Sequence, residues 1–282
     1  MPSVVDLVNS YALIEKGDGR FQADPGHVGR GIIPGGQIVG LMLNAAARLD
    51  PGKEIKSLHA IFSRTVRADQ PVELVLSGAR TGRLFSNTNV DLVQEGRVCA
   101  SGLALLHQPE RDLITHTTTR RASGGPMDAP VMASLTDEGI EVRSVGGVDT
   151  MDRADRGPAQ VSFWVRMAGV SDLVTSQALV SFFTAVWLIP TALRPHEWAM
   201  ADTHVEISTG PVSHTMWFHA PFTVDQWLLF ELESPQAGRG RTFGQGHIYD
   251  ESGAVVASCG EENMIRHFPE GQSPTGQEHT IL

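Results

Sequence analysis

Two predicted helix starts could place backbone amides against a negatively charged group. Gly35-Gly36 opens one helix and Ser176-Gln177 opens the other. The first N–H groups of a helix have no partner within it, and the helix dipole adds positive charge there. Glycine lets a bound group approach the backbone closely. Each start is therefore a candidate binding site, with Gln37 and Gln177 beside it, although Gly35-Gly36 would equally suit a tight strand-to-helix turn.

Histidines and cations form a second set of candidates. His59 and His214 lie 155 residues apart in predicted strands, so we expect them at equivalent positions of two repeats. Such a symmetric pair favours a structural or interface role over a catalytic one, although His59 stays a possible substrate contact. Cations of the first half could bind phosphate groups or be solvated loop charges, and they are Lys53, Lys56, Arg64, Arg80 and Arg83.

The first helix is predicted over residues 35–51 and is apolar on almost every side. A stripe at helical spacing consists of Ile38, Leu41, Met42, Ala45 and Leu49. A helix of this kind is expected to be buried. Four strand-like runs follow it without a second helix, at 57–66, 71–80, 84–94 and 97–107. A buried helix followed by an antiparallel sheet that curls around it is the plan of a hotdog fold.

The second half repeats the first at a near-constant offset of 155–158 residues. The matched pairs are His59 and His214, Asp69-Gln70 and Asp225-Gln226, Gly82 and Gly238, Phe85 and Phe243, and Ala100-Ser101 and Ala257-Ser258. A constant offset with one element order predicts two copies of a fold. A second helix is expected at 175–189, ended by Pro190, with an insertion at 194–203.

These elements predict an α+β double hotdog. Two central helices are each wrapped by a curved antiparallel sheet, and the two sheets join into one because joining covers exposed edges. The predicted domains are an N-terminal hotdog at 1–108, with a first strand near 11–15, and a C-terminal hotdog at 155–268. A Gly- and Pro-rich linker at 109–154 separates them, and residues 269–282 form a flexible tail.

Bulk composition excludes several classes. The 22 Lys and Arg residues against 32 Asp and Glu residues give a net charge of −10, which argues against a nucleic-acid partner. No signal peptide or membrane-spanning run is expected, so we predict a cytoplasmic protein without a membrane partner. Cys99 and Cys259 lie in predicted strands without metal-ligand spacing, which favours two reduced, buried thiols.

Several motifs resemble the acyl-CoA thioesterase II family, in the order that the family has them. They are 34–40 (PGGQIVG), 57–64 (SLHAIFSR), 80–86 (RTGRLFS), 214–222 (HTMWFHAPF), 227–229 (WLL), 233–235 (ESP) and 255–258 (VVAS), with Glu262 and Arg266 following. The resemblance covers roughly residues 10–108 and 160–266. It implies a double hotdog that hydrolyses acyl-CoA to free acid and CoA without a metal or other cofactor, as a homo-oligomer of two or more copies.

The family's catalytic positions are substituted in this chain. The resemblance places the family's helix aspartate at Ala185, its strand hydroxyl at Pro211 and its last-strand glutamine at Glu261. Glu261 could instead serve as general base if it faces inward, or be a salt-bridged or surface glutamate. Hydroxyls that could hold the water are Thr184, Thr209 and Ser213. Thr209, Pro211 and Ser213 are expected on one strand face, while Thr184 could simply bond to its own helix.

The first functional hypothesis is an acyl-CoA thioesterase acting on medium- and long-chain fatty acyl groups. The runner-up is a protein of this fold that binds acyl-CoA with little or no hydrolysis, and a hotdog hydratase ranks third. The apolar side chains expected along the acyl chain are Leu41, Met42, Phe182, Phe183 and Trp187.

Overall fold

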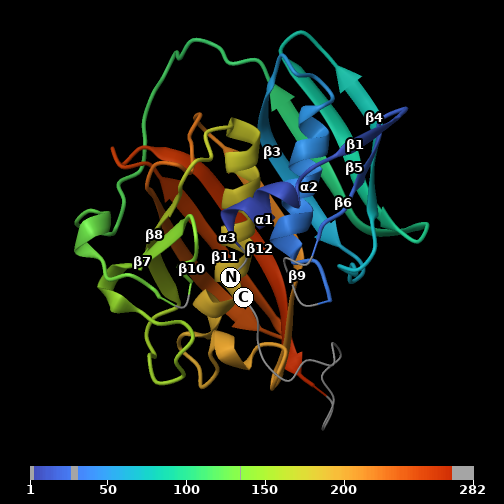
Figure 1. The fold of residues 1–282 in the computed structure, drawn as a ribbon. Coiled ribbons are helices and arrows are strands. Elements are labelled where there is room, and N and C mark those ends of the chain that lie inside the picture. The colour runs from blue at the N-terminus through green and yellow to red at the C-terminus, as the bar shows by residue number, and fades with distance from the viewer. Residues whose placement is uncertain (1–2, 27–30, 134, 269–282) are drawn as a thin grey trace.

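The computed structural model describes residues 3–26, 31–133 and 135–268, and it forms one joined sheet around two helices (Figure 1). Twelve antiparallel strands follow the order β1-β2-β4-β5-β6-β3-β9-β12-β11-β10-β8-β7. Those of the N-terminal half are β1 (Ile14–Gly17), β2 (Arg20–Ala23), β3 (Glu54–Phe62), β4 (Val72–Thr81), β5 (Phe85–Gln94) and β6 (Arg97–His107). The others are β7 (Ile140–Ser144), β8 (Gln160–Met167), β9 (Ile207–Phe218), β10 (Leu228–Gly238), β11 (Arg241–Tyr249) and β12 (Val255–His267).

The two hotdog sheets meet at β3 and β9, which confirms the predicted joined sheet. Leu58 lies opposite Met216 and Ala60 opposite His214 across this junction. All four side chains are buried on the inner face. The predicted double hotdog is confirmed by this single antiparallel sheet with one core helix in each half.

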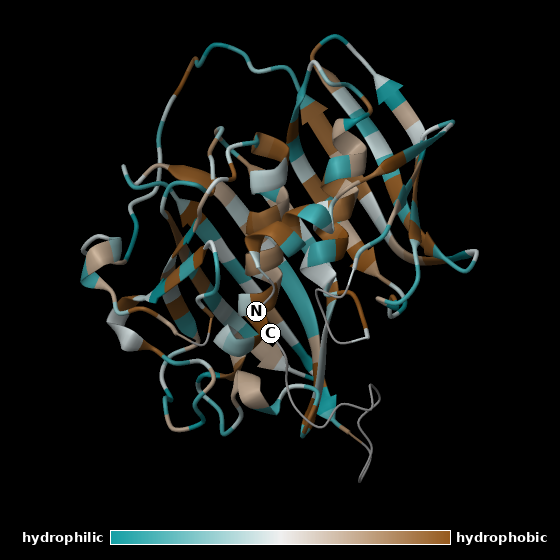
Figure 2. Cartoon of the chain, in the orientation of Figure 1, coloured by the Kyte–Doolittle hydropathy of each residue, from teal (hydrophilic) through white to brown (hydrophobic). Residues whose placement is uncertain are grey.

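Helices α2 (Gly35–Ala47) and α3 (Leu173–Leu193) lie side by side inside the sheet (Figure 1). Figure 2 shows both as mostly hydrophobic segments at the centre of the molecule. They approach closely because Gly36 has no side chain, and a Cβ there would lie 2.6 Å from the Phe182 Cα. α2 ends at Ala47, four residues before the predicted end, where the chain turns toward β3.

The prediction that Pro190 ends the second helix is wrong. α3 runs from Leu173 to Leu193 with Pro190 inside it. Its last turn is buried, because Ile189 and Leu193 pack against Ile207, and this packing outweighs the local cost of proline. With 21 residues, α3 has the length and apolarity to cross a membrane, yet 78% of its most apolar window is buried inside the fold, as expected for a core helix.

The N-terminal segment differs from the strand predicted near residues 11–15. It contains α1 (Val4–Asn9), whose start is capped reciprocally by Ser3 and Asp6, and β1 begins only at Ile14. Tyr11 lies between them and packs on α2 at Gly40, where a Cβ would be 2.4 Å from the tyrosine ring. The Ser-x-x-Asp spacing is a capping signal that the strand prediction overlooked.

The segment 109–154 is also more ordered than a linker. It contains a 3₁₀ turn (Pro126–Asp128) and the edge strand β7, which pairs with β8. It covers the outer face of the C-terminal sheet, where the N–H of Arg121 donates to the buried Glu231 carboxylate at 2.9 Å. Beneath it lies a separate apolar cluster of Ala129, Trp164, Trp227, Leu229 and Tyr249. The short alternation from Ile140 to Ser144 was hidden by the glycines and prolines around it.

Candidate active site

A chain of three hydrogen-bonded side chains lies between α3 and the C-terminal sheet. Glu261 on β12 and His214 on β9 are direct partners across the ladder, so their side chains point to the same inner face. The Glu261 Oε2 lies 2.7 Å from the His214 Nδ1. The His214 Nε2 lies 3.1 Å from the Thr184 Oγ1 on α3. All three side chains are buried, and both His214 ring nitrogens therefore have a partner.

The inward position predicted for one of two consecutive glutamates is confirmed at Glu261. Glu262, its neighbour, is exposed on the other side of the strand. Burial raises the pKa of the Glu261 carboxyl, while the hydrogen bond and charge of His214 and the nearby Asn263 amide act in the opposite direction. A buried carboxyl with a raised pKa and a defined histidine partner is suited to accept a proton.

The Thr184 hydroxyl sets how many protons this chain holds. It lies 3.1 Å from the Ser181 carbonyl oxygen as well as from His214. If the hydroxyl donates to Ser181, the His214 Nε2 must carry a proton and donate to Thr184. One further proton then lies between His214 and Glu261, and the pair has no net charge. If the hydroxyl donates to His214 instead, the chain can carry a single negative charge on Glu261.

The start of α2 lies next to this chain and has no side-chain cap. Its N-cap residue is Pro34, and no described residue accepts a hydrogen bond from the N–H of Gly35 or Gly36. A Cβ on Gly36 would lie 2.8 Å from the Ser181 carbonyl oxygen, and one on Gly35 would lie 2.4 Å from the Pro211 Cγ. The start of α2 therefore packs against β9 and α3, the elements that contain His214 and Thr184.

The start of α3 is different, because a side chain already occupies it. The Asp172 carboxylate accepts hydrogen bonds from the Thr175 N–H at 2.8 Å and from the Thr175 hydroxyl at 2.7 Å. This carboxylate cap satisfies one of the amides at the helix start, and its negative charge offsets the positive end of the helix dipole. The predicted amide site at Ser176 and Gln177 is wrong, because α3 begins earlier, at Leu173, and the Ser176 N–H donates to the Asp172 carbonyl oxygen at 2.9 Å. Of the two predicted pairs, Gly35 and Gly36 alone lie at a helix start and have no acceptor among the described residues.

The two glutamines predicted to bind substrate are buried at the helix starts. The Gln37 Nε2 donates to the Pro25 carbonyl oxygen at 2.8 Å, which ties α2 to the segment before it. Gln177 is likewise almost fully buried. In each residue the Oε1 atom has no hydrogen-bond partner among the described residues.

The expectation that His59 and His214 are equivalent is wrong. His59 is exposed on the outer face of the sheet, and its Nδ1 lies 2.5 Å from the Thr215 Oγ1. The buried positions of β3 and β9 correspond at a repeat offset of 156. At that offset the position equivalent to His214 is Leu58, and the position equivalent to Thr215 is His59. The offset of one residue reverses the face because side chains alternate along a strand.

The predicted shared face of Thr209, Pro211 and Ser213 is also wrong. Ser213 pairs with Glu262 and Pro211 with Asn263, so β9 has one extra residue at this point. Such a bulge changes which side chains point inward. Ser213 lies on the side of the exposed Glu262, whose Oε2 is 3.5 Å from the Ser213 Oγ. Thr209 is buried, and Ala185 is buried on α3 next to Thr184.

Two of the five predicted cations, Lys53 and Lys56, are committed to other contacts, and Arg64, Arg80 and Arg83 are exposed. Lys53 forms an ion pair with Asp50 and donates to Ser86 at 2.9 Å. Lys56 donates to the Phe218 carbonyl oxygen at 2.7 Å, and burial lowers the pKa of its amine. Arg64 is exposed just after β3, where its backbone N–H donates to the Cys99 carbonyl oxygen. Both Cys99 and Cys259 are free and buried, as predicted.

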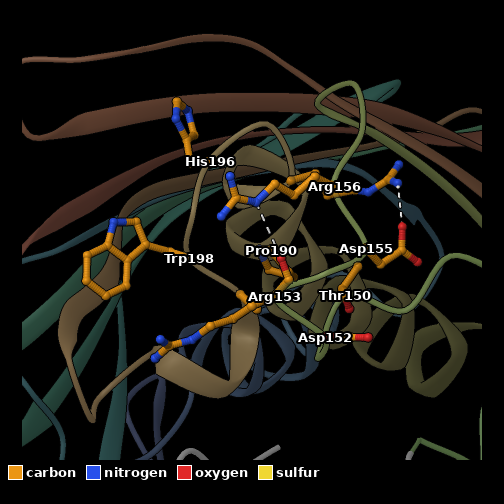
Figure 3. A pocket seen from close by; sticks show the side chains of 10 residues that line it. Thr150, Asp152, Arg153, Asp155, Arg156, Pro190, His196 and Trp198 are labelled. Atoms are coloured by element: carbon orange, nitrogen blue, oxygen red, sulfur yellow. Dashed lines mark hydrogen bonds and ion pairs between the residues drawn. The ribbon is translucent and has the colours of Figure 1, made fainter.

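A shallow pocket at the C-terminal end of α3 is a second place where charged groups meet (Figure 3). His196 and Trp198 lie on one side of it and Asp155 on another. Two of its arginines are neutralised locally, since Arg153 pairs with Asp202 and Glu206, and Arg194 pairs with Asp155. No group of three or more His, Cys, Asp or Glu side chains among the described residues could hold a metal ion.

Sequence reasoning missed two residues of the site, His214 and Asn263. The sequence match of His214 with His59 favours a structural role for both, and the strand pairing corrects it. Counting inward positions along both strands would have placed His214 opposite Glu261. Asn263 follows Glu261 by two residues and therefore shares its face, and its side chain is fully buried.

Comparison with known proteins agrees with this architecture. A model of acyl-CoA thioesterase N-terminal domains matches residues 24–107, and one of C-terminal domains matches residues 108–265. The chain is 29% identical to human acyl-coenzyme A thioesterase 8 over 84% of this chain and 81% of that protein. It is 27% identical to acyl-CoA thioesterase 2 of Haemophilus influenzae over 93% and 97% of the two chains.

Solved structures give the same result. The acyl-CoA thioesterase II TesB2 of Mycobacterium marinum superposes with a TM-score of 0.76 at 26% identity, covering 95% of this chain and 99% of that chain. A tesB protein of Mycobacterium avium subspecies paratuberculosis shares the fold with a TM-score of 0.79 at 23% identity over 94% and 100% of the chains. Since both domain models match in order along most of its length, the chain belongs to the acyl-CoA thioesterase family.

Proposed function

We propose that this protein hydrolyses medium- and long-chain fatty acyl-CoA to free fatty acid and CoA, with Glu261 as the group that activates water. The observation that carries the proposal is the buried Glu261–His214–Thr184 chain beside the uncapped start of α2. Family membership supports thioesterase chemistry in general, and the substituted residues Ala185 and Pro211 call for a different water-activating group.

Glu261 and His214 are suited to activating water, and the amides of Gly35 and Gly36 are suited to stabilising the carbonyl oxygen. The ionised Glu261 takes a proton from water on Oε1, which has no partner among the described residues, while His214 holds Oε2. The resulting hydroxide forms a bond to the thioester carbon. The N–H groups of Gly35 and Gly36 stabilise the negative charge that develops on the carbonyl oxygen. The carbon–sulfur bond then breaks, and the CoA sulfur takes the proton back from Glu261.

The remaining groups define substrate binding in this proposal. Pro34, Gly35 and Pro211 are partly exposed, so a thioester can reach the amides of α2 from solvent. Thr184 orients His214, and Thr209 is a further inward hydroxyl. The acyl chain runs along the helices near Leu41, Met42, Phe182, Phe183 and Trp187, with Gln37 and Gln177 at their starts and Arg64 toward the CoA phosphates. A cytoplasmic location and a homo-oligomer belong to the same proposal.

The second candidate is an acyl-CoA-binding protein that hydrolyses little or nothing. Ala185 and Pro211 favour it, because neither side chain can hold or activate water. Under this hypothesis the Glu261–His214 pair only stabilises the fold.

The direct test is to measure the CoA released from decanoyl-CoA with a thiol reagent. Wild type is expected to turn over, and Glu261→Gln is expected to lower kcat by about 10²- to 10⁴-fold, the usual contribution of a general base, with substrate affinity retained. Glu262→Gln removes the exposed neighbouring carboxylate and is the matched control. Retained or increased activity in Glu261→Gln would exclude Glu261 as the base, and binding without release by wild type would favour the second candidate.

The pH dependence provides an independent measurement on the same proteins. Because burial raises the pKa of Glu261 above its usual 4.5, kcat should rise with pH through that higher pKa, and Glu261→Gln should lose this rise. The contribution of Glu261 to the free energy of unfolding should instead fall as pH rises. The folded state binds this proton more tightly than the unfolded state, so stabilisation present below the unfolded pKa is lost as pH rises through the folded pKa.

A further inference from the structure

Away from the proposed active site, two histidine rings on the outer face of the C-terminal sheet converge on one serine hydroxyl. The His219 Nε2 and the His247 Nδ1 each lie 2.8 Å from the Ser258 Oγ. The two ring nitrogens are therefore separated by no more than twice that distance. We call His219, His247 and Ser258 the histidine pair site, and none of the three takes part in the hydrolysis proposed above.

Three neighbouring segments hold this site in place. Ser258 lies on β12, directly opposite His247 on β11. His219 follows β9 directly, and its N–H donates to the Val256 carbonyl oxygen at 2.8 Å. Because side chains alternate along a strand, Ser258 points to the face opposite that of Glu261, three residues further on. The site therefore lies on the solvent side of the sheet, where both histidines are exposed.

The serine hydroxyl cannot serve both rings in the same way. It has a single proton, so the Ser258 Oγ donates to one ring nitrogen and accepts from the other. One nitrogen therefore already directs a lone pair at the space beside the hydroxyl, and the second ring is turned toward the same point. If the proton of the second ring moves to its other nitrogen, two lone pairs converge there without a change in charge.

The surroundings of His219 favour the neutral form of its ring. Partial burial and the positive charges of Lys56 and His247 lower the pKa of His219 below its usual 6.5. A neutral imidazole is the form that binds metal ions. The Lys56 amine itself is held by the Phe218 carbonyl oxygen, which accepts its hydrogen bond at 2.7 Å.

Charges on β10 offset that of Lys56 on the other side of the site. Glu231 lies directly opposite His247 across the β10–β11 ladder. Glu231 and Glu233 share the single positive charge of Arg121, which leaves an excess of negative charge there. A cation between the two rings is therefore surrounded by charges of both signs.

We propose that the histidine pair site binds a first-row transition-metal cation such as Zn²⁺ through the His219 Nε2 and the His247 Nδ1. Imidazole nitrogens suit this class of metal, whereas Ca²⁺ and Mg²⁺ prefer oxygen ligands. Zn–N bonds of about 2.0–2.1 Å are shorter than the present contacts, so the two exposed rings close on the cation, and the Ser258 hydroxyl and water complete its coordination. The bound cation links the end of β9 to β11 across β12.

Titration calorimetry with ZnCl₂ on protein treated with EDTA and then dialysed tests the proposal. Wild type is expected to bind Zn²⁺ saturably at one ion per chain, and CaCl₂ is expected to give no saturable binding. His219→Ala and His247→Ala should each weaken Zn²⁺ binding at least about tenfold, a loss that changing even an outer partner of a metal ligand can cause. His59→Ala is the matched control, because His59 is also exposed and contacts a hydroxyl, that of Thr215, on the same outer face.

Thermal unfolding provides a second measurement on the same proteins. A ligand that binds only the folded state raises the Tm, so Zn²⁺ should raise the Tm of wild type and of His59→Ala, and EDTA should reverse the rise. The Tm of His219→Ala and of His247→Ala should not respond. The proposal is overturned if wild type shows no saturable Zn²⁺ binding, if Ca²⁺ binds as tightly as Zn²⁺, or if either variant of the pair binds Zn²⁺ within tenfold of wild type.

Discussion

The starts of α2 and α3 are equivalent in the two hotdogs but differ in what they offer a ligand. α3 begins at a carboxylate cap, with Asp172 bonded to Thr175. α2 begins at Pro34 without a side-chain cap, and two glycines follow. A carboxylate cap bonds one amide and places a negative charge at the helix start, which disfavours an anionic ligand there. In this molecule the start of α3 carries that charge and the start of α2 does not.

The polar residues are divided in the opposite way. The buried hydrogen-bonded chain lies in the C-terminal half, where Thr184, His214 and Glu261 meet. At the matching position of the N-terminal half, β3 has Leu58 in place of His214, and it belongs to the apolar core. The proposed site therefore requires both repeats, because in it the first supplies amides and the second supplies the titratable groups.

The largest expected effect comes from replacing His214 by leucine, with His59→Leu as its control. His214→Leu leaves the Glu261 carboxyl buried without its partner, so it should lower the free energy of unfolding by about 3 kcal/mol and reduce kcat. His59→Leu changes an exposed side chain and should alter stability by less than about 0.5 kcal/mol. Urea denaturation measures the free energy of unfolding of both variants. Equal losses of that free energy would contradict the faces assigned to β3 and β9.

Gly36→Ala should have the next largest effect. Its Cβ would lie 2.6 Å from the Phe182 Cα, so α2 must move away from α3, at a cost of about 1–3 kcal/mol. The same movement separates the α2 amides from Glu261 and should lower kcat. Gly210→Ala is the matched control, since nothing lies within 4 Å of its added Cβ. Unchanged stability and kcat in Gly36→Ala would show that the helix contact is looser than described.

Asp172→Ala should have the smallest effect. Loss of the carboxylate cap is expected to lower stability by about 1 kcal/mol, as measured by thermal unfolding, without changing CoA release. Thr175→Val keeps the backbone part of the cap and should cost less. A loss of activity in Asp172→Ala would instead place the functional amides at α3 and reverse the comparison between the two starts.

Much of this architecture could be predicted because it depends on patterns that persist over many residues. The apolar stripe of α2, the β4–β6 alternation and the constant repeat offset all survive small errors of position. The joined sheet follows from the same repeat. Longer-range packing decided the rest, as at Pro190, where burial of Ile189 and Leu193 keeps α3 helical.

The candidate site was harder to predict because it depends on single-residue register. The bulge in β9 places Ser213 and Pro211 on different faces. The repeat offset of β3 and β9 is 156 rather than 155, so His59 and His214 also lie on different faces. A sequence pattern does not reveal which residue is the extra one in a bulged strand. Glu261 was identified through a resemblance, whereas its partner His214 became evident only from the paired strands.

The junction between β3 and β9 has a consequence for synthesis of the chain. β3 is complete by Phe62, but β9 starts at Ile207, so about 150 residues must be made before the junction can close. Until then the N-terminal half presents an unpaired strand edge and the face of α2 that later packs on Phe182. Exposed edges and apolar faces of this kind promote association between nascent chains. An N-terminal fragment made alone is therefore a candidate for aggregation or chaperone binding.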